Sequence, residues 1–178
     1  MPDVLPAGGS VFGIEIERKF RLRAAPSPEV LAAHRAQARR MEQIYLTEPP
    51  TGRRIRRIER ADGTVEHRLT RKERVGDFRF HEQEEAITAD RFEALRLEAD
   101  PDRAPIRKTR FVVPHGSQLL EIDVFESPPG LVVLEVELAT EDEPVLLPDW
   151  VGEWREVTGE PEYLNVNLAK RGTPVPAW

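Results

Sequence analysis

Charged and apolar residues alternate along short segments of this chain, and this alternation limits the fold more than any other feature. Near the N-terminus, Glu15, Glu17 and Lys19 are interleaved with Ile14 and Ile16. Because successive side chains of a β-strand point to opposite faces, the pattern predicts a strand with one charged face. Such a face either contacts water or points at other charged groups.

Six later segments repeat this pattern, with charged residues two positions apart. Their charged positions are Arg54 and Arg56; Glu66, Arg68 and Lys72; Glu82 and Glu84; Lys108 and Arg110; Glu121 and Asp123; Glu135 and Glu137. A single pair of this kind is most often a solvated strand face. Most of these segments carry one sign of charge, however, and like-charged neighbours repel each other. A barrel whose lumen holds the charged residues explains the sorting, whereas charged exterior faces on an ordinary antiparallel β protein are the simpler alternative.

Lysine is used sparingly and in particular places. Of the 26 basic residues, only Lys19, Lys72, Lys108 and Lys170 are lysines, and the others are arginines. Three of these four lysines lie on the charged strand faces. This placement also favours a functional role for those faces.

Turn and capping residues separate the predicted elements: Ser27 and Thr88 are the expected helix caps, 49–52 is a predicted loop, and Ala61-Asp62-Gly63 predicts a hairpin turn. Strands are predicted at 13–20, 40–47, 53–60, 64–72, 78–87, 106–113, 118–125 and 131–139, and helices at 29–38, 89–99 and 161–170. Residues 141–147 and 150–157 are expected to be helical or irregular, and Phe92, Leu95 and Leu97 are expected to face inward. The fold class is therefore mainly β (α+β). We expect a closed eight-stranded antiparallel tunnel with flanking helices and a C-terminal helix.

Composition excludes several classes of protein. Residues 1–10 are expected to form a flexible tail without signal-peptide features, and 11–178 a single domain. The net charge of −6 argues against binding to a nucleic acid polymer, and the absence of cysteine excludes thiolate chemistry. No apolar run approaches the length of about 18 residues that spans a membrane. We expect a cytoplasmic protein without a membrane partner, and a homodimer is possible.

The two kinds of charged strand predict complementary chemistry. Clustered carboxylates are hard oxygen ligands that suit Mg²⁺ or Mn²⁺. Arginine and lysine clusters suit phosphate oxygens. No glycine-rich phosphate loop, His-Glu-x-x-His or Gly-x-Ser-x-Gly motif occurs, so side chains would have to hold the phosphates. Together these features predict a polyphosphate held between cations for metal-assisted hydrolysis.

The chain also resembles a known family. Glu15-x-Glu17-x-Lys19 is similar to the Glu-x-Glu-x-Lys signature of the CYTH domain superfamily, the triphosphate tunnel metalloenzymes. The later motifs follow in the order that this family shows: Arg54-Ile55-Arg56, Leu69-Thr70-Arg71-Lys72, Glu82-x-Glu84, Lys108-Thr109-Arg110-Phe111, Glu121-x-Asp123-Val124-Phe125 and Val133-x-Glu135-x-Glu137. The region 150–169, with Tyr163 and Asn165, resembles the C-terminal part of compact bacterial members. The resemblance covers about residues 12–170.

This resemblance implies roles for particular residues. The metal ligands would be Glu15, Glu17, Glu84, Asp123, Glu135 and Glu137. The phosphate-binding residues would be Lys19, Arg54, Arg56, Lys72, Lys108 and Arg110. Lys19, Glu17 and Glu137 would take part in catalysis. The roles of Glu82, Glu121, Tyr163 and Lys170 stay open, and Glu85, Arg53 and Arg57 have the opposite parity and are expected to face outward.

The leading hypothesis is hydrolysis of inorganic tripolyphosphate to pyrophosphate and phosphate, dependent on Mg²⁺ or Mn²⁺. Class IV adenylate cyclase and thiamine triphosphatase activities are alternatives on the same fold. A tunnel that only binds polyphosphate or nucleotide is the alternative from another class. In each case the expected partner is a small-molecule triphosphate.

Overall fold

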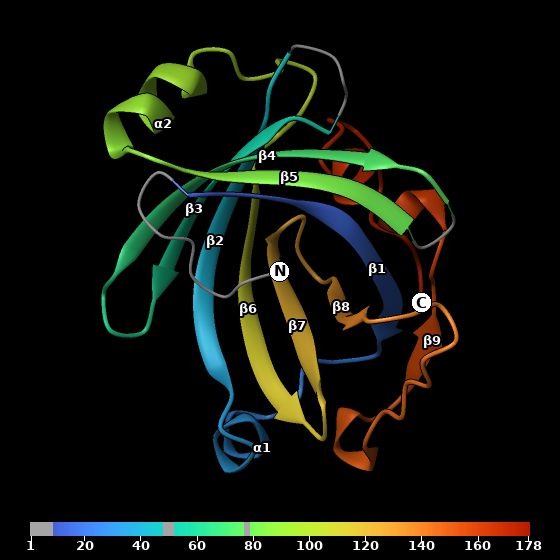
Figure 1. Ribbon diagram of the computed structural model, residues 1–178. Coiled ribbons are helices and arrows are strands. Elements are labelled where there is room, and N and C mark those ends of the chain that lie inside the picture. Colours follow the sequence, from blue (N-terminus) through green and yellow to red (C-terminus); the bar gives the residue numbers. More distant parts are fainter. Residues whose placement is uncertain (1–8, 48–51, 77–78) are drawn as a thin grey trace.

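Eight antiparallel strands close into a barrel (Figure 1). The structure is a computed structural model that describes residues 9–47, 52–76 and 79–178. The strands are β1 (Ser10–Leu22), β2 (Gln37–Tyr45), β3 (Arg54–Arg60), β4 (Val65–Arg74), β5 (Arg79–Ile87), β6 (Ile106–His115), β7 (Gln118–Ser127), β8 (Val132–Leu138) and the additional β9 (Trp154–Glu156). Around the barrel the neighbours follow the order β5-β4-β3-β2-β6-β7-β8-β1, and β1 pairs again with β5. The closed barrel predicted from the sequence is therefore confirmed.

Strand β1 closes the barrel because it has different partners along its length. Its first half pairs with β5, from Ser10 opposite Glu85 to Ile16 opposite Arg79. Its second half pairs with β8, from Ile16 to Arg21. Beyond the start of β5, the short strand β9 pairs with the end of β1. The predicted hairpin between β3 and β4 is also present, with Gly63 at a φ of 85° that glycine adopts without strain.

Two helices lie outside the barrel, and both begin at the predicted caps. The side chain of Ser27 accepts a hydrogen bond from the first turn of α1 (Pro28–Ala33), and that of Thr88 does so for α2 (Ala89–Arg96). Both helices end earlier than predicted. The prediction that Leu97 faces inward is wrong, since it follows α2 and its side chain is 89% exposed.

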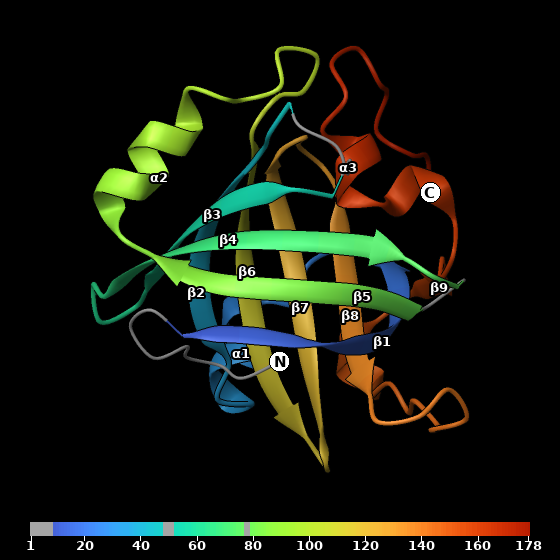
Figure 2. The same cartoon turned by 45° about the horizontal axis from the view of Figure 1, so that its top comes forward.

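The C-terminal region differs most from the sequence-based prediction. In place of one closing helix over 161–170, there are a 3-10 turn η2 (Pro161–Tyr163), an extended Leu164 and a single helical turn α3 (Asn165–Leu168). Figure 2 shows α3 beside one end of the barrel. Another 3-10 turn, η1 (Asp149–Val151), precedes strand β9, which pairs with distant β1 and has no pattern of its own.

The predicted N-terminal tail overlaps the first strand. Gly9 and Ser10 were assigned to the tail, but Ser10 begins β1 and the Gly9 carbonyl accepts a hydrogen bond from Ala86 N. Residues 1–8, most of the predicted loop at 49–52, and the predicted strand start at 78 lie outside the described residues. No helix in the described part of the chain is long and apolar enough to cross a membrane.

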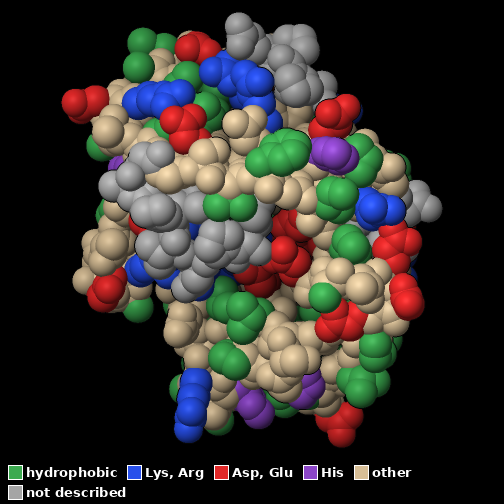
Figure 3. Space-filling view, viewed as in Figure 1, with side chains coloured by type: hydrophobic (Ala, Val, Ile, Leu, Met, Phe, Trp, Pro, Cys, Tyr) green, Lys and Arg blue, Asp and Glu red, His purple; other side chains and the backbone are tan. Residues whose placement is uncertain are grey.

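The charged strand faces point into the barrel. Glu17, Lys19, Arg54, Glu82 and Lys108 are all buried, although each carries a charge. In the space-filling view, acidic side chains are visible in a recess near the middle of the face shown (Figure 3). Much of the barrel interior is therefore a polar lumen. A buried apolar cluster, called the C-terminal cluster below, joins barrel residues to the C-terminal segment; it comprises Tyr45, Ile106, Phe125, Leu131, Val133, Val157, Tyr163, Leu168 and Ala169.

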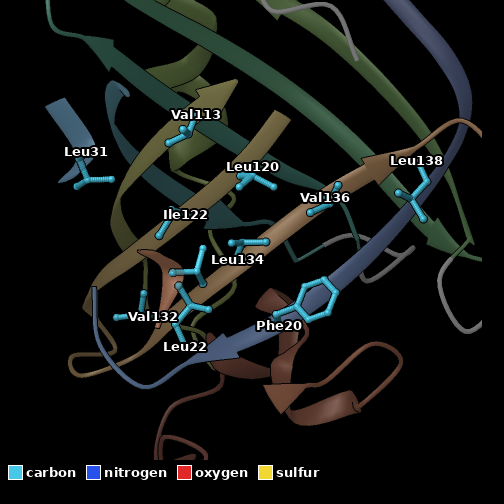
Figure 4. Packing of buried hydrophobic residues seen from close by; sticks show 11 residues of the cluster. Phe20, Leu22, Leu31, Val113, Leu120, Ile122, Val132, Leu134, Val136 and Leu138 are labelled. Carbon is cyan, nitrogen blue, oxygen red and sulfur yellow. The ribbon is translucent and has the colours of Figure 1, made fainter. Parts of the chain in front are cut away.

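The main hydrophobic core lies outside the barrel wall (Figure 4). It is formed by the outward faces of β1, β6, β7 and β8, together with Leu31 of α1 and Val151 of η1. Leu120, Ile122, Leu134 and Val136 are completely buried there. A second outer cluster lies under α2, where Phe92 and Leu95 pack against Ile55. These outer contacts stabilise a barrel whose inner face carries many charged side chains.

Candidate active site

The lumen forms two adjoining chambers with volumes of about 220 and 440 Å³. Six charged residues line both chambers and mark their junction: Glu15, Arg56, Glu82, Arg110, Glu121 and Glu137. The first chamber also contains the three luminal lysines and is lined at one end by Leu164, Asn165 and Val166. The C-terminal segment therefore forms part of its wall.

Strands β1 and β8 bring carboxylates directly opposite one another. In their antiparallel register Glu17 faces Glu137, and Lys19 faces Glu135. Two like charges in opposed positions are unfavourable unless a cation lies close by. Lys19 Nζ lies 2.9 Å from Glu135 Oε1 and 3.8 Å from Glu17 Oε1. Burial alone would lower the pKa of Lys19, but these two carboxylates outweigh burial and raise it, so the ammonium stays charged.

Lys72 neutralises the acidic residues on the other side of the first chamber. Its Nζ lies 2.6 Å from Glu15 Oε2, 2.9 Å from Glu17 Oε2 and 3.8 Å from Glu82 Oε2. Burial opposes the charged form, yet the pKa of Lys72 is raised because Glu17 and Glu15 dominate. One ammonium on β4 thus connects carboxylates of β1 and β5.

Arg110 is the centre of a second network. Its guanidinium donates to both oxygens of Asp123 at 2.7 Å, to Glu135 Oε2 at 2.6 Å, and to Glu121. Lys108 also donates to Asp123. Asp123 is fully buried and lines neither chamber, so its geometry is that of a residue that holds two cations in place. The pKa of Arg110 is raised well above its usual value, because Asp123 and Glu121 outweigh the effect of burial.

Arginines crowd together at the junction with the second chamber. Arg56 and Arg68 both donate to Glu84, with Arg68 at 2.7 Å, and the hydroxyl of Thr70 lies 3.0 Å from the same carboxylate. Burial, followed by the nearby guanidinium of Arg54, lowers the pKa of Arg56 to about 10. The arginine therefore stays protonated at neutral pH, and an additional anion beside it would favour its charged form.

The structure brings most of the predicted site residues together. The predicted residues that line the first chamber are Glu15, Glu17, Lys19, Arg54, Arg56, Lys72, Lys108, Arg110, Glu135 and Glu137. Glu84 lines only the second chamber, and Asp123 lies behind both. Their individual roles stay predictions.

The residues whose roles were left open lie in three different places. Glu82 and Glu121 line both chambers. Tyr163 is buried in the C-terminal cluster, and its carbonyl accepts a hydrogen bond from Lys19 Nζ at 3.4 Å. Lys170 is exposed and lines neither chamber.

Sequence reasoning missed the contribution of β2. Its inward face carries two buried neutral groups, and Gln43 Nε2 donates a hydrogen bond to Tyr45 Oη at 2.9 Å. Both residues line the first chamber. Gln43 and Tyr45 alternate with Ile44 and Leu46, so strand parity could have placed them on one face. They were missed because the predicted site was built from charged residues and neither side chain is charged.

The acidic residues fit a hard divalent cation by their chemistry. Glu15, Glu17, Glu135 and Glu137 supply only carboxylate oxygens, the donors that Mg²⁺ and Mn²⁺ prefer. Glu15 Oε2 is buried and accepts no well-aligned hydrogen bond, although Lys72 Nζ lies nearby. Among the described residues, no group of three or more such ligands is already gathered around a point, because Lys and Arg now contact these oxygens. A cation would have to displace some of those contacts.

Acid should destabilise the metal-free protein through these buried carboxylates. Burial would raise the pKa of Glu82 and of Glu135, but Arg54 and Lys72 in the first case and Lys19 and Arg110 in the second outweigh it and lower both pKa values. A pKa lower in the folded state gives stability that is present above the unfolded value of about 4.3 and is lost as the pH falls below it. Urea unfolding in EDTA at about pH 7 and at about pH 3.5 should show this loss. The loss should be smaller in Glu82→Gln, and an equal loss in both proteins would contradict the assignment.

Comparison with known proteins finds solved structures with a similar fold. No protein-family model matches the chain. The protein NE1496, whose structure is known as that of an inorganic triphosphatase, is 31% identical, with a TM-score of 0.54 over 87% of this chain and 97% of NE1496. A second structure of NE1496 gives 33% identity and a TM-score of 0.55 over the same shares. The protein PH1012 of Pyrococcus horikoshii, at 21% identity and a TM-score of 0.51 over 72% of this chain and 80% of its own, supports the fold alone.

A curated relative agrees over a shorter segment. An inorganic triphosphatase of Acetivibrio thermocellus is 41% identical over 70 residues. That segment is 39% of this chain and 44% of the relative, so less than half of the relative is matched.

The fold and the site define a class of protein: a closed antiparallel β tunnel whose lumen holds paired carboxylates and a ring of lysines and arginines. The chain belongs to the CYTH, or triphosphate tunnel metalloenzyme, superfamily.

Proposed function

We propose that this protein is a triphosphatase that uses a divalent metal ion to hydrolyse inorganic tripolyphosphate to pyrophosphate and phosphate. One observation carries the proposal: lysines, arginines and carboxylates from seven strands, several of them buried, line one chamber. The likeness to NE1496 over nearly all of that protein supports triphosphatase activity in general. The choice of tripolyphosphate and of Mg²⁺ or Mn²⁺ goes further and rests on the chemistry of the lumen.

The basic residues would bind and orient the substrate. Arg54 and Arg56 on β3, Lys72 on β4, and Lys108 and Arg110 on β6 all line the first chamber. Arginine binds phosphate oxygens in a bidentate manner, and lysine acts as a point charge. Because these groups are fixed by ion pairs before the substrate arrives, little reorganisation is needed when negative charge moves during phosphoryl transfer.

The acidic residues of β1 and β8 would hold the metal ion. When bound by Glu15, Glu17, Glu135 and Glu137, a divalent ion supplies charge stabilisation for the phosphoryl oxygens. Lys19, which lies between Glu17 and Glu135, would contact the phosphate that reacts.

An activity assay tests this proposal directly. Purified protein is incubated with sodium tripolyphosphate and Mg²⁺ or Mn²⁺, and pyrophosphate and phosphate are measured separately. Equal amounts of the two products are expected, and EDTA should abolish their release. Tight binding of tripolyphosphate without any release would instead indicate a binding module.

One observation favours a second candidate, a triphosphate that bears an organic group. The second chamber is the larger one, and its wall includes Met41, Ile58, Val112 and Leu138. An apolar wall next to the phosphate-binding junction is suited to an organic substituent. Assays with ATP, in which cyclic AMP is also measured, and with thiamine triphosphate separate this candidate from tripolyphosphate.

The cytoplasmic location and the homodimer remain predictions from the sequence.

A further inference from the structure

One edge of β1 changes partners beside the reactive part of the lumen. Among the residues that the structure describes, pairing of this edge with β5 stops at Ile16, and pairing with β9 starts at Phe20. The backbone between these two points carries Glu17 and Lys19, whose side chains line the first chamber. The other edge of β1 pairs with β8 through this stretch, but at this break the Lys19 N–H and carbonyl meet no strand among the described residues, so contacts from outside the sheet decide how firmly this edge of Lys19 is held.

The segment after β9 fills this break with contacts to Lys19. The Lys19 N–H donates to Thr158 Oγ1 at 2.9 Å, and the Lys19 carbonyl accepts from Val157 N at 2.9 Å. The ammonium of the same residue donates to the Tyr163 carbonyl at 3.4 Å. The backbone and the side chain of one luminal residue are therefore both held by the segment that follows β9.

Thr158 is itself held in place by a charged pair on the outer side of the sheet. Its hydroxyl donates to Glu156 Oε1 at 2.8 Å, and both carboxylate oxygens of Glu156 accept from Arg18, at 2.9 and 2.6 Å. The hydroxyl can thus accept from the Lys19 N–H while its own proton is used elsewhere. Thr158 lines neither main chamber, so it does not reach the substrate.

From this geometry we propose that Thr158 is a positioning residue that fixes Lys19 for contact with the triphosphate. The hydroxyl takes the place of a missing strand partner at the residue where the lumen needs a fixed cation. The proposal rests on the proposed function, because it assigns the fixed ammonium to a triphosphate. Its physical part, the restraint of Lys19 by Thr158, is independent of turnover.

Amide hydrogen exchange tests the restraint itself. Thr158→Val keeps the shape of the side chain but removes the acceptor, so the Lys19 N–H should exchange faster by at least about tenfold, whereas Thr158→Ser should keep its protection. Thr109→Val is the matched control, since Thr109 lies on β6 and its hydroxyl contacts Glu126 at the surface. Unchanged protection of the Lys19 amide in Thr158→Val would overturn the proposal.

Binding of tripolyphosphate in EDTA tests whether Thr158 acts through Lys19. Lys19→Met should weaken binding by about 10- to 100-fold, the usual effect of losing one charge-assisted hydrogen bond. Thr158→Val should weaken it by about tenfold, because a small displacement of a binding group has effects of this order. In the Lys19→Met background, Thr158→Val should have no further effect, and Thr158→Ser should bind as the wild type does.

The outcomes separate the two proposals. The positioning role is overturned if Thr158→Val lowers the affinity for tripolyphosphate equally in the wild-type and Lys19→Met backgrounds. It is also overturned if Thr158→Val lowers the affinity in neither. If the wild-type protein binds tripolyphosphate but releases no products with metal, the proposed catalytic function fails. The affinities of the single and double variants at Thr158 and Lys19 then still decide the role of Thr158. If the wild type binds no tripolyphosphate either in EDTA or with Mg²⁺ or Mn²⁺, both the proposed function and the positioning role are overturned, whereas binding and turnover that occur only with metal overturn the positioning role as tested in EDTA and leave the proposed function standing.

Discussion

Replacing Glu17 with glutamine is expected to lower the metal-dependent turnover of tripolyphosphate by about 10²- to 10³-fold, the usual effect of removing one fixed group that stabilises developing charge. Glu17 is buried, faces Glu137 across the β1–β8 pair, and contacts both Lys19 and Lys72. Glutamine keeps the shape of the side chain but loses the negative charge that a divalent ion requires. Initial rates at saturating tripolyphosphate measure the effect, and Glu137→Gln should behave in the same way.

Glu85→Gln is the matched control for this experiment. Glu85 follows Glu84 on β5 but points outward, where it forms an ion pair with Arg91. Its replacement should leave turnover within about twofold of the wild type, because the side chain lies outside the lumen. The protein should also stay folded, because a surface ion pair contributes about 1 kcal/mol or less to stability. If Glu17→Gln were as active as Glu85→Gln, the carboxylates of β1 would not belong to the active site. Thermal unfolding of both variants shows whether a lost rate reflects lost structure.

Replacing Leu134 with alanine is expected to lower the free energy of unfolding by about 2–5 kcal/mol. Leu134 is completely buried on the outer face of β8, where it packs in the main core with Phe20 and Ile122 (Figure 4). The adjacent residue Glu135 points into the lumen. A large loss of stability on truncating an outward-facing side chain is expected for a barrel whose main hydrophobic core lies outside its wall.

Urea unfolding followed by circular dichroism measures this loss, and Leu146→Ala provides the control. Leu146 is 76% exposed, so its truncation should change the free energy of unfolding by no more than about 0.5 kcal/mol. Equal effects at the two positions would contradict the outer location of the core. The m-value should stay unchanged in both variants if the folded barrel is retained.

Strand parity explains why so much of the barrel could be predicted. Glu15, Glu17 and Lys19 share one face of β1 because side chains alternate along a strand, whatever the strand's neighbours are. The apolar residues that alternate with the charged ones on β7 and β8 lie in the main core for the same reason. The helix caps Ser27 and Thr88 were also local features, and both are present.

Features that depend on long-range pairing were missed. Strand β9 has only three residues, and it pairs with β1 beyond the part of β5 that the structure describes. The break of the predicted closing helix at Leu164 and the contact of Thr158 with Lys19 likewise depend on where the C-terminal segment meets the barrel. No local pattern in the sequence carries this information.

The positions of individual carboxylates in the site were also decided by tertiary structure. Glu84 and Asp123 have the parity of the other acidic residues, yet Asp123 lies behind Lys108 and Arg110 and Glu84 lines only the second chamber. Parity says which face a side chain is on, but not how far it reaches into the lumen or which cation it meets first.

The sequence by itself determined that the strands carry charge on one face and apolar residues on the other, because a period of two is a property of the single chain. The tertiary structure decided that the charged faces converge, since closure of β1 onto both β5 and β8 turns them toward one another. It also decided which ion pairs form there, because a buried charge must find an opposite charge nearby and only the register between strands supplies one.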